Sequence, residues 1–408
     1  MNIWVIQTSE PLPWLDKSVR YWRSSLLTEE LLKRGNEVVY WAPTFEHHTK
    51  KCFAHLPSVI FPKEGLEIQL MHGRKYKKHV SFARLLSHHS VAREFKKQAV
   101  LEPNPDVVIC ALPNLQIAEA VVNYGKATGV PVIIDVQDPW PDVYLNAVPT
   151  FMRPIFKWLI YSEFRRASRI CKGATALVGI SNSYLDWALK NAGRVANKYD
   201  FVAVLGYQRC PVGSGENKSD YSDKLLAVFA GGFGVSYDLK SLVDCAGLLH
   251  SEKCESIHIV LAGFAEKESE LKKRAGSFPN IEFAGRLSSK ELRELYEKAD
   301  VGLCAYNTNA TQSLPYKPFE YMAAGLPLLS SLSGELAEMI DKERIGLQYT
   351  AGDAVSLARQ LRYLSENRDE CTAMGMRAKN LFERRFRSDI IYPPFADMVE
   401  KIAREARK

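Results

Sequence analysis

Apolar and polar positions follow one pattern along this chain: short runs that are apolar almost throughout alternate with longer stretches of helical periodicity. Such runs predict strands that helices cover on both faces, because a half-exposed strand would alternate apolar and polar residues. The expected strands are residues 2–7, 37–41, 106–110, 130–136 and 176–180 in the first half, and 225–230, 257–262, 281–283, 301–305, 328–331 and 346–349 in the second.

The expected helices lie between these strands. Residues 18–33 form the first, which ends at Gly35, and strand, helix and strand in this order predict a parallel sheet. In the second half a helix is expected over residues 289–299, where Ser288 or Ser289 caps the helix and Glu291 supplies the first-turn carboxylate.

The C-terminal stretch predicts a helix over residues 371–385, after which Pro393 and Pro394 are expected to end one helix and begin another. The final amphipathic segment either packs back across the gap between the two halves or forms a solvated tail. Both interpretations fit its pattern of apolar and basic residues.

The polar, turn-rich segment 206–223 separates two alternating series of strands and helices and is typical of a linker. We therefore expect an α/β protein with two doubly wound domains, at residues 1–205 and 206–387, followed by a C-terminal helix at 388–408. Ligands of such domains bind at the carboxyl ends of the strands, which favours a cleft between the two domains.

Charge is distributed unevenly along the 408 residues, whose net charge is +7. Residues 1–200 hold 26 Lys and Arg against 18 Asp and Glu, and residues 71–100 alone hold eight basic residues and one acidic residue. This basic segment is either a solvated helix face or a surface for an anionic membrane or acceptor. It does not favour nucleic acid, because no recognised binding motif accompanies the charge.

Two classes of protein are disfavoured by composition. The apolar N-terminal run is too short for a signal peptide, and no segment approaches the ~20 apolar residues of a membrane-spanning helix. The eight cysteines are scattered without a C-x-x-C pair, so neither a disulfide framework nor a metal site is expected. A reducing cytoplasm is the expected compartment.

Residues 313–327, SLPYKPFEYMAAGLP, carry the most specific chemistry. A loop with a serine, two prolines and Lys317 leads into a short helix that holds Glu320. The start of a helix favours anions, because its dipole and its unpaired N–H groups both attract negative charge. A carboxylate one turn further suits a pair of sugar hydroxyls, and the combination of phosphate and diol sites describes a nucleotide sugar.

A glycine turn at the end of the first strand of the second half provides another phosphate-suited segment, AGGFGVSYDLKSL at residues 230–242. Glycines allow the backbone to approach a pyrophosphate closely, although such a turn can also be purely structural. Lys240 and Lys317 are the cations expected near a diphosphate, unless they are ordinary surface lysines. Arg286 and Leu287 follow another strand and either border a flat base or belong to a plain loop.

In the first half, Asp138 directly follows a buried strand and precedes Pro139-Trp140-Pro141. A carboxylate on a stiff loop at this position suits catalysis or acceptor binding, whereas Asp135 or Asp138 can also serve as a helix cap or turn former. Residues 150–174 interleave aromatic and basic residues. They predict a basic amphipathic helix that either lies in a membrane interface or packs on the domain core.

With these motifs, the chain resembles the GT-B glycosyltransferases, and family 4 in particular, over nearly its whole length. The segment FEYMAAGLPLLSSLSGELAEMI resembles the donor-site signature around the second glutamate of that family's paired-glutamate motif. The segment DVQDPWPD is similar to the acceptor-facing loop of members that act in surface-polysaccharide assembly. The opening residues resemble the family's first βαβ unit.

The resemblance implies two Rossmann-like domains that face a central cleft, and it assigns site residues. Asp138, Lys240 and Glu320 would act in catalysis, with Glu320 holding the ribose hydroxyls. The residues implied in donor binding are Gly232, Phe233, Gly234, Gly263, Arg286, Leu287, Gln312, Ser313, Leu314, Pro315, Lys317 and Glu320, and those implied in acceptor binding are Ser9, Glu10 and Trp140.

The reaction that the resemblance implies is transfer of a hexosyl or N-acetylhexosaminyl group, with retention, from a nucleotide diphosphate sugar. UDP-sugar is the expected donor, a glycan or lipid-linked molecule the expected acceptor, and no metal or other cofactor is expected. The expected location is the cytoplasm, with peripheral contact to the inner face of the membrane. A sugar-nucleotide epimerase and a non-catalytic nucleotide-sugar-binding subunit are the alternatives.

Three positions depart from the family pattern. Gln312 stands where the family has its first glutamate, and it can donate or accept a hydrogen bond but carries no charge. Ser9-Glu10-Pro11 replaces the paired glycines of the first turn. Phe233 or Gly234 occupies the position of an expected arginine, so that Lys240 alone remains of a basic pair.

Overall fold

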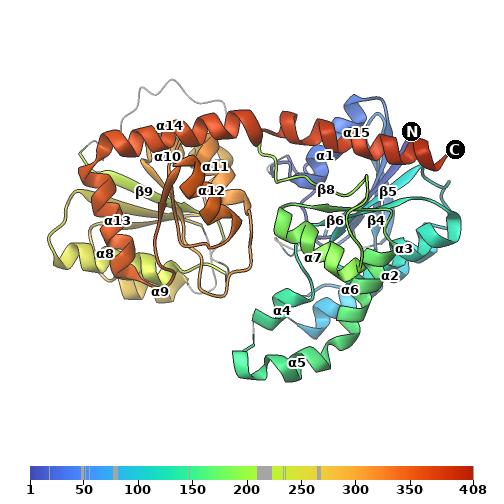
Figure 1. Ribbon diagram of the computed structural model, residues 1–408, viewed down its shortest axis with the longest axis horizontal. Coiled ribbons are helices and arrows are strands. Elements are labelled where there is room, and N and C mark those ends of the chain that lie inside the picture. Colours follow the sequence, from blue (N-terminus) through green and yellow to red (C-terminus); the bar gives the residue numbers. More distant parts are fainter. Residues whose placement is uncertain are drawn as a thin grey trace. The chain divides into compact units, whose positions relative to one another are not determined.

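The computed structural model describes residues 1–17, 19–46, 50, 52–54, 56–76, 81–146, 148–208, 223–232, 234, 236–263 and 268–407. These residues form two compact units, Met1–Val204 with Ile391–Lys408, and Leu205–Ile390 (Figure 1). Both are Rossmann-like α/β units, as expected from the sequence. The sequence predicts a domain boundary after residue 205, and the two units divide after Val204. Most of the expected linker, residues 206–223, lies outside the described residues.

The first unit is built on an eight-stranded sheet with the order β3-β4-β2-β1-β5-β6-β7-β8. All neighbours pair in parallel except β3 and β4. The inner strands β5 and β6 are buried along their whole length, and Asp135 of β6 is their only charged residue. The strands are β1 (Asn2–Ile6), β2 (Glu37–Pro43), β3 (Ser58–Lys63), β4 (Leu66–Met71), β5 (Val107–Leu112), β6 (Val132–Val136), β7 (Ala176–Gly179) and β8 (Phe201–Val202).

Helices cover both faces of this sheet: α1 and α15 lie on one, and α2, α3, α6 and α7 on the other (Figure 1). The helices are α1 (Arg23–Lys33), α2 (Phe82–Gln98), α3 (Leu115–Thr128), α4 (Asp142–Asn146), η1 (Thr150–Met152), α5 (Arg153–Leu159), α6 (Tyr161–Gly173), α7 (Asn182–Ala192) and α15 (Ser388–Ala406).

Two features of the first unit differ from the sequence prediction. The antiparallel pair β3 and β4 was not predicted, because β3 alternates exposed with half-buried positions and β4 carries Glu67 and Gln69 among its apolar residues. The helix expected over residues 18–33 begins only at Arg23. At this point a side chain from outside the helix satisfies one of its first N–H groups, since the Ser24 N–H donates to the Glu10 carboxylate at 3.0 Å.

The double proline does not break the C-terminal helix, contrary to the sequence prediction. Pro393 and Pro394 lie inside α15, just beyond its first turn. The fixed φ of proline is compatible with a helix, so the two prolines remove only two backbone hydrogen bonds near one end of α15. Burial of the apolar side chains of α15 offsets the loss of these hydrogen bonds. This burial also rules out a solvated tail. The buried side chains of α15 are Tyr392, Phe395, Ala396, Val399, Ile402 and Ala403, all in the core of the first unit.

The second unit has six parallel strands in the order β11-β10-β9-β12-β13-β14. When the six strands are numbered by their order along the chain, their order across the sheet is 3-2-1-4-5-6, as in a dinucleotide-binding fold. The direction in which successive strands are added to the sheet reverses between β9 and β12. The strands are β9 (Leu225–Ala230), β10 (Ile257–Ala262), β11 (Ile281–Gly285), β12 (Val301–Cys304), β13 (Leu328–Ser330) and β14 (Gly346–Gln348).

The helices of this unit also cover both faces, with α8, α9 and α13 on one and α10, α11 and α14 on the other (Figure 1). The predicted capping box of α10 is confirmed, because Ser288 and Glu291 each accept a hydrogen bond from the other's backbone N–H. The helices are α8 (Leu239–Ser251), α9 (Glu268–Ala275), α10 (Ser289–Lys298), α11 (Tyr316–Ala323), α12 (Glu335–Glu343), α13 (Ala354–Glu366) and α14 (Arg368–Arg385).

Candidate functional site

Glycines form the carboxyl edge of the second sheet at the ends of β9, β10 and β11. The Gly231 N–H donates to the Ala262 carbonyl at 2.8 Å, and the Gly263 N–H donates to the Gly285 carbonyl at 2.7 Å. Gly231 has a φ of +136°, which side chains rarely adopt. No side chain of these glycines therefore covers the backbone at this edge. The Gly231 turn lies where the strand order reverses.

Helix α11 is fixed beside this turn by Tyr321. Its ring packs against Gly302 of β12 so closely that a β-carbon on that glycine would lie 2.3 Å from the ring. The Tyr321 hydroxyl accepts a hydrogen bond from the Ala230 N–H at 3.0 Å and donates to the Leu303 carbonyl at 3.4 Å. One buried tyrosine thus attaches α11 to the ends of both strands that flank the reversal.

Lys317, in the first turn of α11, directs its ammonium group at the glycine turn. A β-carbon on Gly231 would lie only 1.8 Å from Lys317 Nζ. The side chain is buried, and its ammonium lies 5.0 Å from the ring centre of Phe229 and 4.6 Å from that of Tyr237. The aromatic rings stabilise a cation in this position without neutralising it. The amine is therefore held at the backbone where a phosphate could approach.

Glu320 lies one turn further along α11 and is also buried. Its Oε2 accepts a hydrogen bond from the Tyr296 hydroxyl of α10 at 3.1 Å. Burial, followed by the neighbouring charge of Glu320, raises the pKa of Tyr296 well above its ordinary value, so the hydroxyl remains a donor. Tyr296 orients the carboxylate, which no sequence pattern had indicated.

The loop before α11 is tied to its surroundings by Gln312 and Ser313. The Gln312 amide donates through Nε2 to the Ser236 hydroxyl at 3.1 Å, which connects this loop to the segment after the glycine turn. Within the described part of the chain, Gln312 Oε1 is buried without a hydrogen-bond partner. The Ser313 hydroxyl donates to Glu335 in the first turn of α12 at 2.9 Å.

The other predicted donor residues lie around the same edge. Leu314 is buried, and Pro315 precedes α11 as its N-cap without a side-chain cap. Gly232 and Gly234 are exposed in the turn, whereas Phe233 lies outside the described residues. Lys240 is exposed in the first turn of α8, in contrast to the buried Lys317.

Arg286 is exposed and Leu287 half-buried in the loop between β11 and α10. Apart from Phe233, the structure thus brings the predicted donor residues of this unit to one edge of one sheet. Sequence reasoning included Gly231 and Tyr237 in the predicted glycine turn at residues 230–242 without giving either of them a role. It missed Phe229, Tyr296 and Glu335.

Two of the predicted acceptor residues, Ser9 and Glu10, follow β1 in the first unit. The buried Glu10 carboxylate accepts hydrogen bonds from Gln7 Nε2 at 2.9 Å and from both the N–H and the hydroxyl of Ser24. Burial raises the pKa of Glu10 to about 7, against the opposing effect of the Ser24 hydrogen bonds. The Ser9 N–H and hydroxyl both donate to Gln7 Oε1. Glu10 therefore caps α1, and its carboxylate already carries several hydrogen bonds.

A buried ion pair lies next to this network. Arg23 and Asp135 make two hydrogen bonds of 2.8 Å, and Arg23 also donates to the carbonyl of Ala203 at 2.7 Å. The guanidinium lies 5.3 Å from the ring centre of Phe395 of α15. Asp135 lies in strand β6 and serves as the partner of Arg23, not as the helix cap or turn former that the sequence allowed.

Asp138 and Trp140 lie at the carboxyl end of β6. Burial raises the pKa of Asp138 to about 6, while the positive charge of Arg84 in α2 lowers it. The Arg84 guanidinium lies 5.0 Å from the Trp140 ring centre, and the rings of His88 and Trp140 are 6.1 Å apart. Burial lowers the pKa of His88 to about 3, so its imidazole is neutral. A carboxylate, a cation and an aromatic surface therefore share this part of the first unit.

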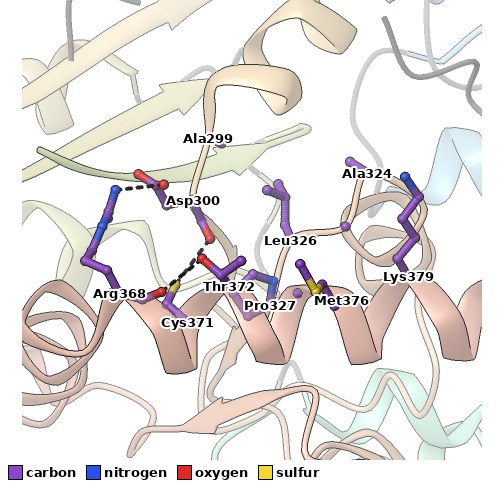
Figure 2. A pocket seen from close by; sticks show the side chains of 12 residues that line it. Ala299, Asp300, Ala324, Leu326, Pro327, Arg368, Cys371, Thr372, Met376 and Lys379 are labelled. Carbon is purple, nitrogen blue, oxygen red and sulfur yellow. Dashed lines mark hydrogen bonds and ion pairs between the residues drawn. The ribbon is translucent and has the colours of Figure 1, made fainter. Parts of the chain in front are cut away.

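A further pocket lies at the opposite edge of the second sheet, before β12 and β13 and along α14 (Figure 2). Most of its polar groups pair with one another. Arg368 pairs with Asp300 at 3.0 Å, and Asp300 also accepts a hydrogen bond from the Leu226 N–H at 2.8 Å. These contacts join strands and helices, and none of the predicted site residues lines the pocket.

Two other kinds of feature are absent from the described residues. They contain no group of three or more His, Cys, Asp or Glu side chains placed to hold a metal ion. Nor does any helix among them have the length and apolarity that crossing a bilayer requires.

Residues 224–367 match the protein family described as glycosyl transferases group 1. The matched segment contains the glycine turn, Lys317 and Glu320. The chain is also 27% identical over 149 residues to the amylovoran biosynthesis glycosyltransferase AmsK of Erwinia amylovora. That match spans 35% of this chain and only 37% of the length of AmsK.

Solved structures show the same fold over the whole chain. HepE of Anabaena in complex with UDP superposes with a TM-score of 0.68 at 12% identity, covering 98% of this chain and 100% of HepE. Sucrose-phosphate synthase from Thermosynechococcus elongatus superposes with a TM-score of 0.75 at 13% identity, covering 99% of each chain. The fold is therefore that of the GT-B proteins, as the sequence predicted.

Proposed function

We propose that this protein is a glycosyltransferase that moves a sugar from a nucleotide diphosphate sugar to a glycan or lipid-linked acceptor during surface-polysaccharide synthesis. The observation that carries the proposal is the Lys317 ammonium, buried against the Gly231 turn where the strand order of the second sheet reverses. We further propose a UDP-sugar donor and retention at the anomeric carbon.

The diphosphate would bind between the Gly231 turn and the start of α11. Three attractive features meet there: the backbone of the turn, the positive end of the helix and the Lys317 ammonium. Each becomes more favourable as negative charge develops on the departing diphosphate, which is how such a site accelerates transfer. Lys240 at the start of α8 would add a more distant, solvent-screened charge.

The nucleoside and the sugar would lie on either side of this diphosphate. Glu320, oriented by Tyr296, would accept hydrogen bonds from the ribose hydroxyls. Gln312 would serve the sugar, because its Nε2 is engaged by Ser236 while its buried Oε1 can accept a hydrogen bond from a sugar hydroxyl. A neutral amide in this position would hold the sugar without adding negative charge to the site.

The acceptor would bind to the first unit near Asp138 and Trp140. With a pKa raised to about 6, Asp138 would be mostly ionised at neutral pH and able to accept a proton from an acceptor hydroxyl. Arg84 would attract an anionic part of the acceptor. We propose that the reaction needs no metal ion, and that the protein works in the cytoplasm at the inner face of the membrane.

The comparisons support this proposal in separate ways. The family match covers the segment that holds the proposed donor site. AmsK is named for amylovoran biosynthesis, and HepE of the same fold was solved with UDP.

The proposal is tested by thermal melting of the full chain with a panel of UDP-, GDP-, ADP- and dTDP-sugars. A true donor raises the melting temperature by mass action, and we expect one UDP-sugar to do so.

Incubation of that donor with and without a membrane extract then distinguishes the functions. Acceptor-dependent release of the nucleoside diphosphate supports the transferase, and conversion of the sugar without acceptor would show an epimerase. Binding without any turnover would indicate a non-catalytic subunit.

A further inference from the structure

The first unit exposes a group of large apolar side chains on η1, α5 and the start of α6, which we call the α5 surface. Phe151 is 81% exposed, Trp158 76% and Ile155 63%. The remaining members of the α5 surface are Met152, Leu159 and Tyr161. Neither η1 nor α5 contains a buried residue, so this segment contributes nothing to the core of the unit.

The next helix behaves differently, although the sequence pattern continues through it. In α6 the residues Ala167, Ile170 and Cys171 are buried against α3 and α7. Figure 1 shows α5 projecting from the first unit beside α4, beyond the end of α6. The two interpretations of residues 150–174 therefore apply to different parts: α6 packs on the domain, and α5 is left uncovered in the described structure.

The charged residues within the segment that carries the α5 surface are all basic. Residues 143–162 contain no Asp or Glu but do contain Arg153 and Lys157. The Lys157 ammonium lies 5.2 Å from the ring centre of Phe164, which holds the cation beside the apolar side chains. The first acidic residue beyond this segment, Glu163, is paired with Arg166. The α5 surface is thus apolar with a basic margin.

This composition fits an anionic lipid surface better than other occupants. Aromatic and aliphatic side chains enter the region between headgroups and acyl chains, and Lys and Arg beside them attract anionic headgroups. A second copy of the same surface would bring Arg153 and Lys157 against their own counterparts, which is unfavourable. With seven residues, α5 is far too short to cross a bilayer and would lie in the interface.

We propose that the α5 surface docks the protein onto anionic bilayers. Docking rests on apolar insertion of side chains such as Trp158, with Arg153 and Lys157 providing the preference for anionic lipid. The inference does not depend on the proposed transferase activity, because it uses no residue of the candidate site.

Sedimentation of the full chain with vesicles tests this proposal without any donor or acceptor. We expect the protein to bind vesicles that contain about 30% phosphatidylglycerol and to bind pure phosphatidylcholine weakly. Ile155→Glu combined with Trp158→Glu should reduce the partition coefficient at least about tenfold, because two inserted side chains become charged. Arg153→Gln combined with Lys157→Gln should mainly reduce the difference between the two kinds of vesicle.

Leu101→Glu and Val195→Glu serve as matched controls, because these apolar residues of the same unit are 81% and 87% exposed but lie outside the α5 surface. They should bind vesicles like the wild type. The proposal is overturned if the wild type does not bind anionic vesicles, or if the Ile155/Trp158 variant binds as well as the controls. It is also overturned if sedimentation equilibrium shows a dimer that only this variant dissociates while vesicle binding is unchanged.

Discussion

The ammonium of Lys317 lies against the backbone of Gly231, where any β-carbon would come within 1.8 Å of Nζ. Gly231→Ala should therefore displace the lysine and strain a backbone with a φ of +136°. We expect a loss of about 1–3 kcal/mol in the free energy of unfolding. Nucleotide affinity should fall at least about tenfold, since the cation leaves the phosphate site. Denaturant unfolding and calorimetry measure the two effects.

Gly232→Ala is the matched control for this variant. A β-carbon on Gly232 meets no atom within 4 Å, and its φ is not in the left-handed region. The free energy of unfolding should therefore stay close to that of the wild type. Equal stability losses in both variants would contradict the described contact between Lys317 and Gly231.

Glu320→Ala should weaken binding of UDP by about 10- to 100-fold, the effect of losing hydrogen bonds to a charged acceptor. If Glu320 holds the ribose hydroxyls, the wild type should prefer UDP over 2′-deoxy-UDP, and the variant should lose that preference. Tyr296→Phe should have a smaller effect, because it removes only the 3.1 Å hydrogen bond that orients the carboxylate. Glu338→Ala, an exposed carboxylate of α12, is the control. An unchanged ribose preference in Glu320→Ala would refute the assignment.

Asp138 should control turnover rather than donor binding. Because burial raises its pKa to about 6, the ionised fraction falls as pH falls through that value, and kcat of the wild type should fall with it. Asp138→Asn should lower kcat at least about 100-fold and leave the affinity for the nucleotide nearly unchanged. A pH–rate profile and calorimetry give these values. A variant with wild-type kcat would remove Asp138 from the reaction centre.

Glu10 should make the stability of the protein depend on pH. Its folded pKa of about 7 lies above the ordinary 4.5, so the folded chain holds a proton that the unfolded chain has lost between these values. The free energy of unfolding should therefore decrease as pH rises through this window, by on the order of 3 kcal/mol from this group. Glu10→Gln cannot titrate and should show a smaller decrease between pH 5 and pH 8. Parallel curves for both proteins would contradict the raised pKa.

Strands buried on both faces were predictable from the sequence, because their apolar runs leave little ambiguity; β9 and β10 have the expected bounds. The weakly patterned pair β3 and β4 was not, and α15 continues through Pro393 because tertiary burial outweighs local preference. Within the candidate site, Lys317 and Glu320 could be found from their loop and helix. Tyr296 could not, because its hydrogen bond to Glu320 spans 24 residues and depends on how α10 packs.

We propose that Lys317 and the Gly231 turn hold the diphosphate of a nucleotide sugar. Calorimetric titration of UDP, GDP, ADP and dTDP into the wild type, Lys317→Gln and the exposed control Lys290→Gln tests it most directly. We expect UDP to bind the wild type and the control equally, and to bind Lys317→Gln at least about tenfold more weakly. Equal affinity in all three proteins, or no binding of any nucleoside diphosphate to the wild type, would contradict the claim.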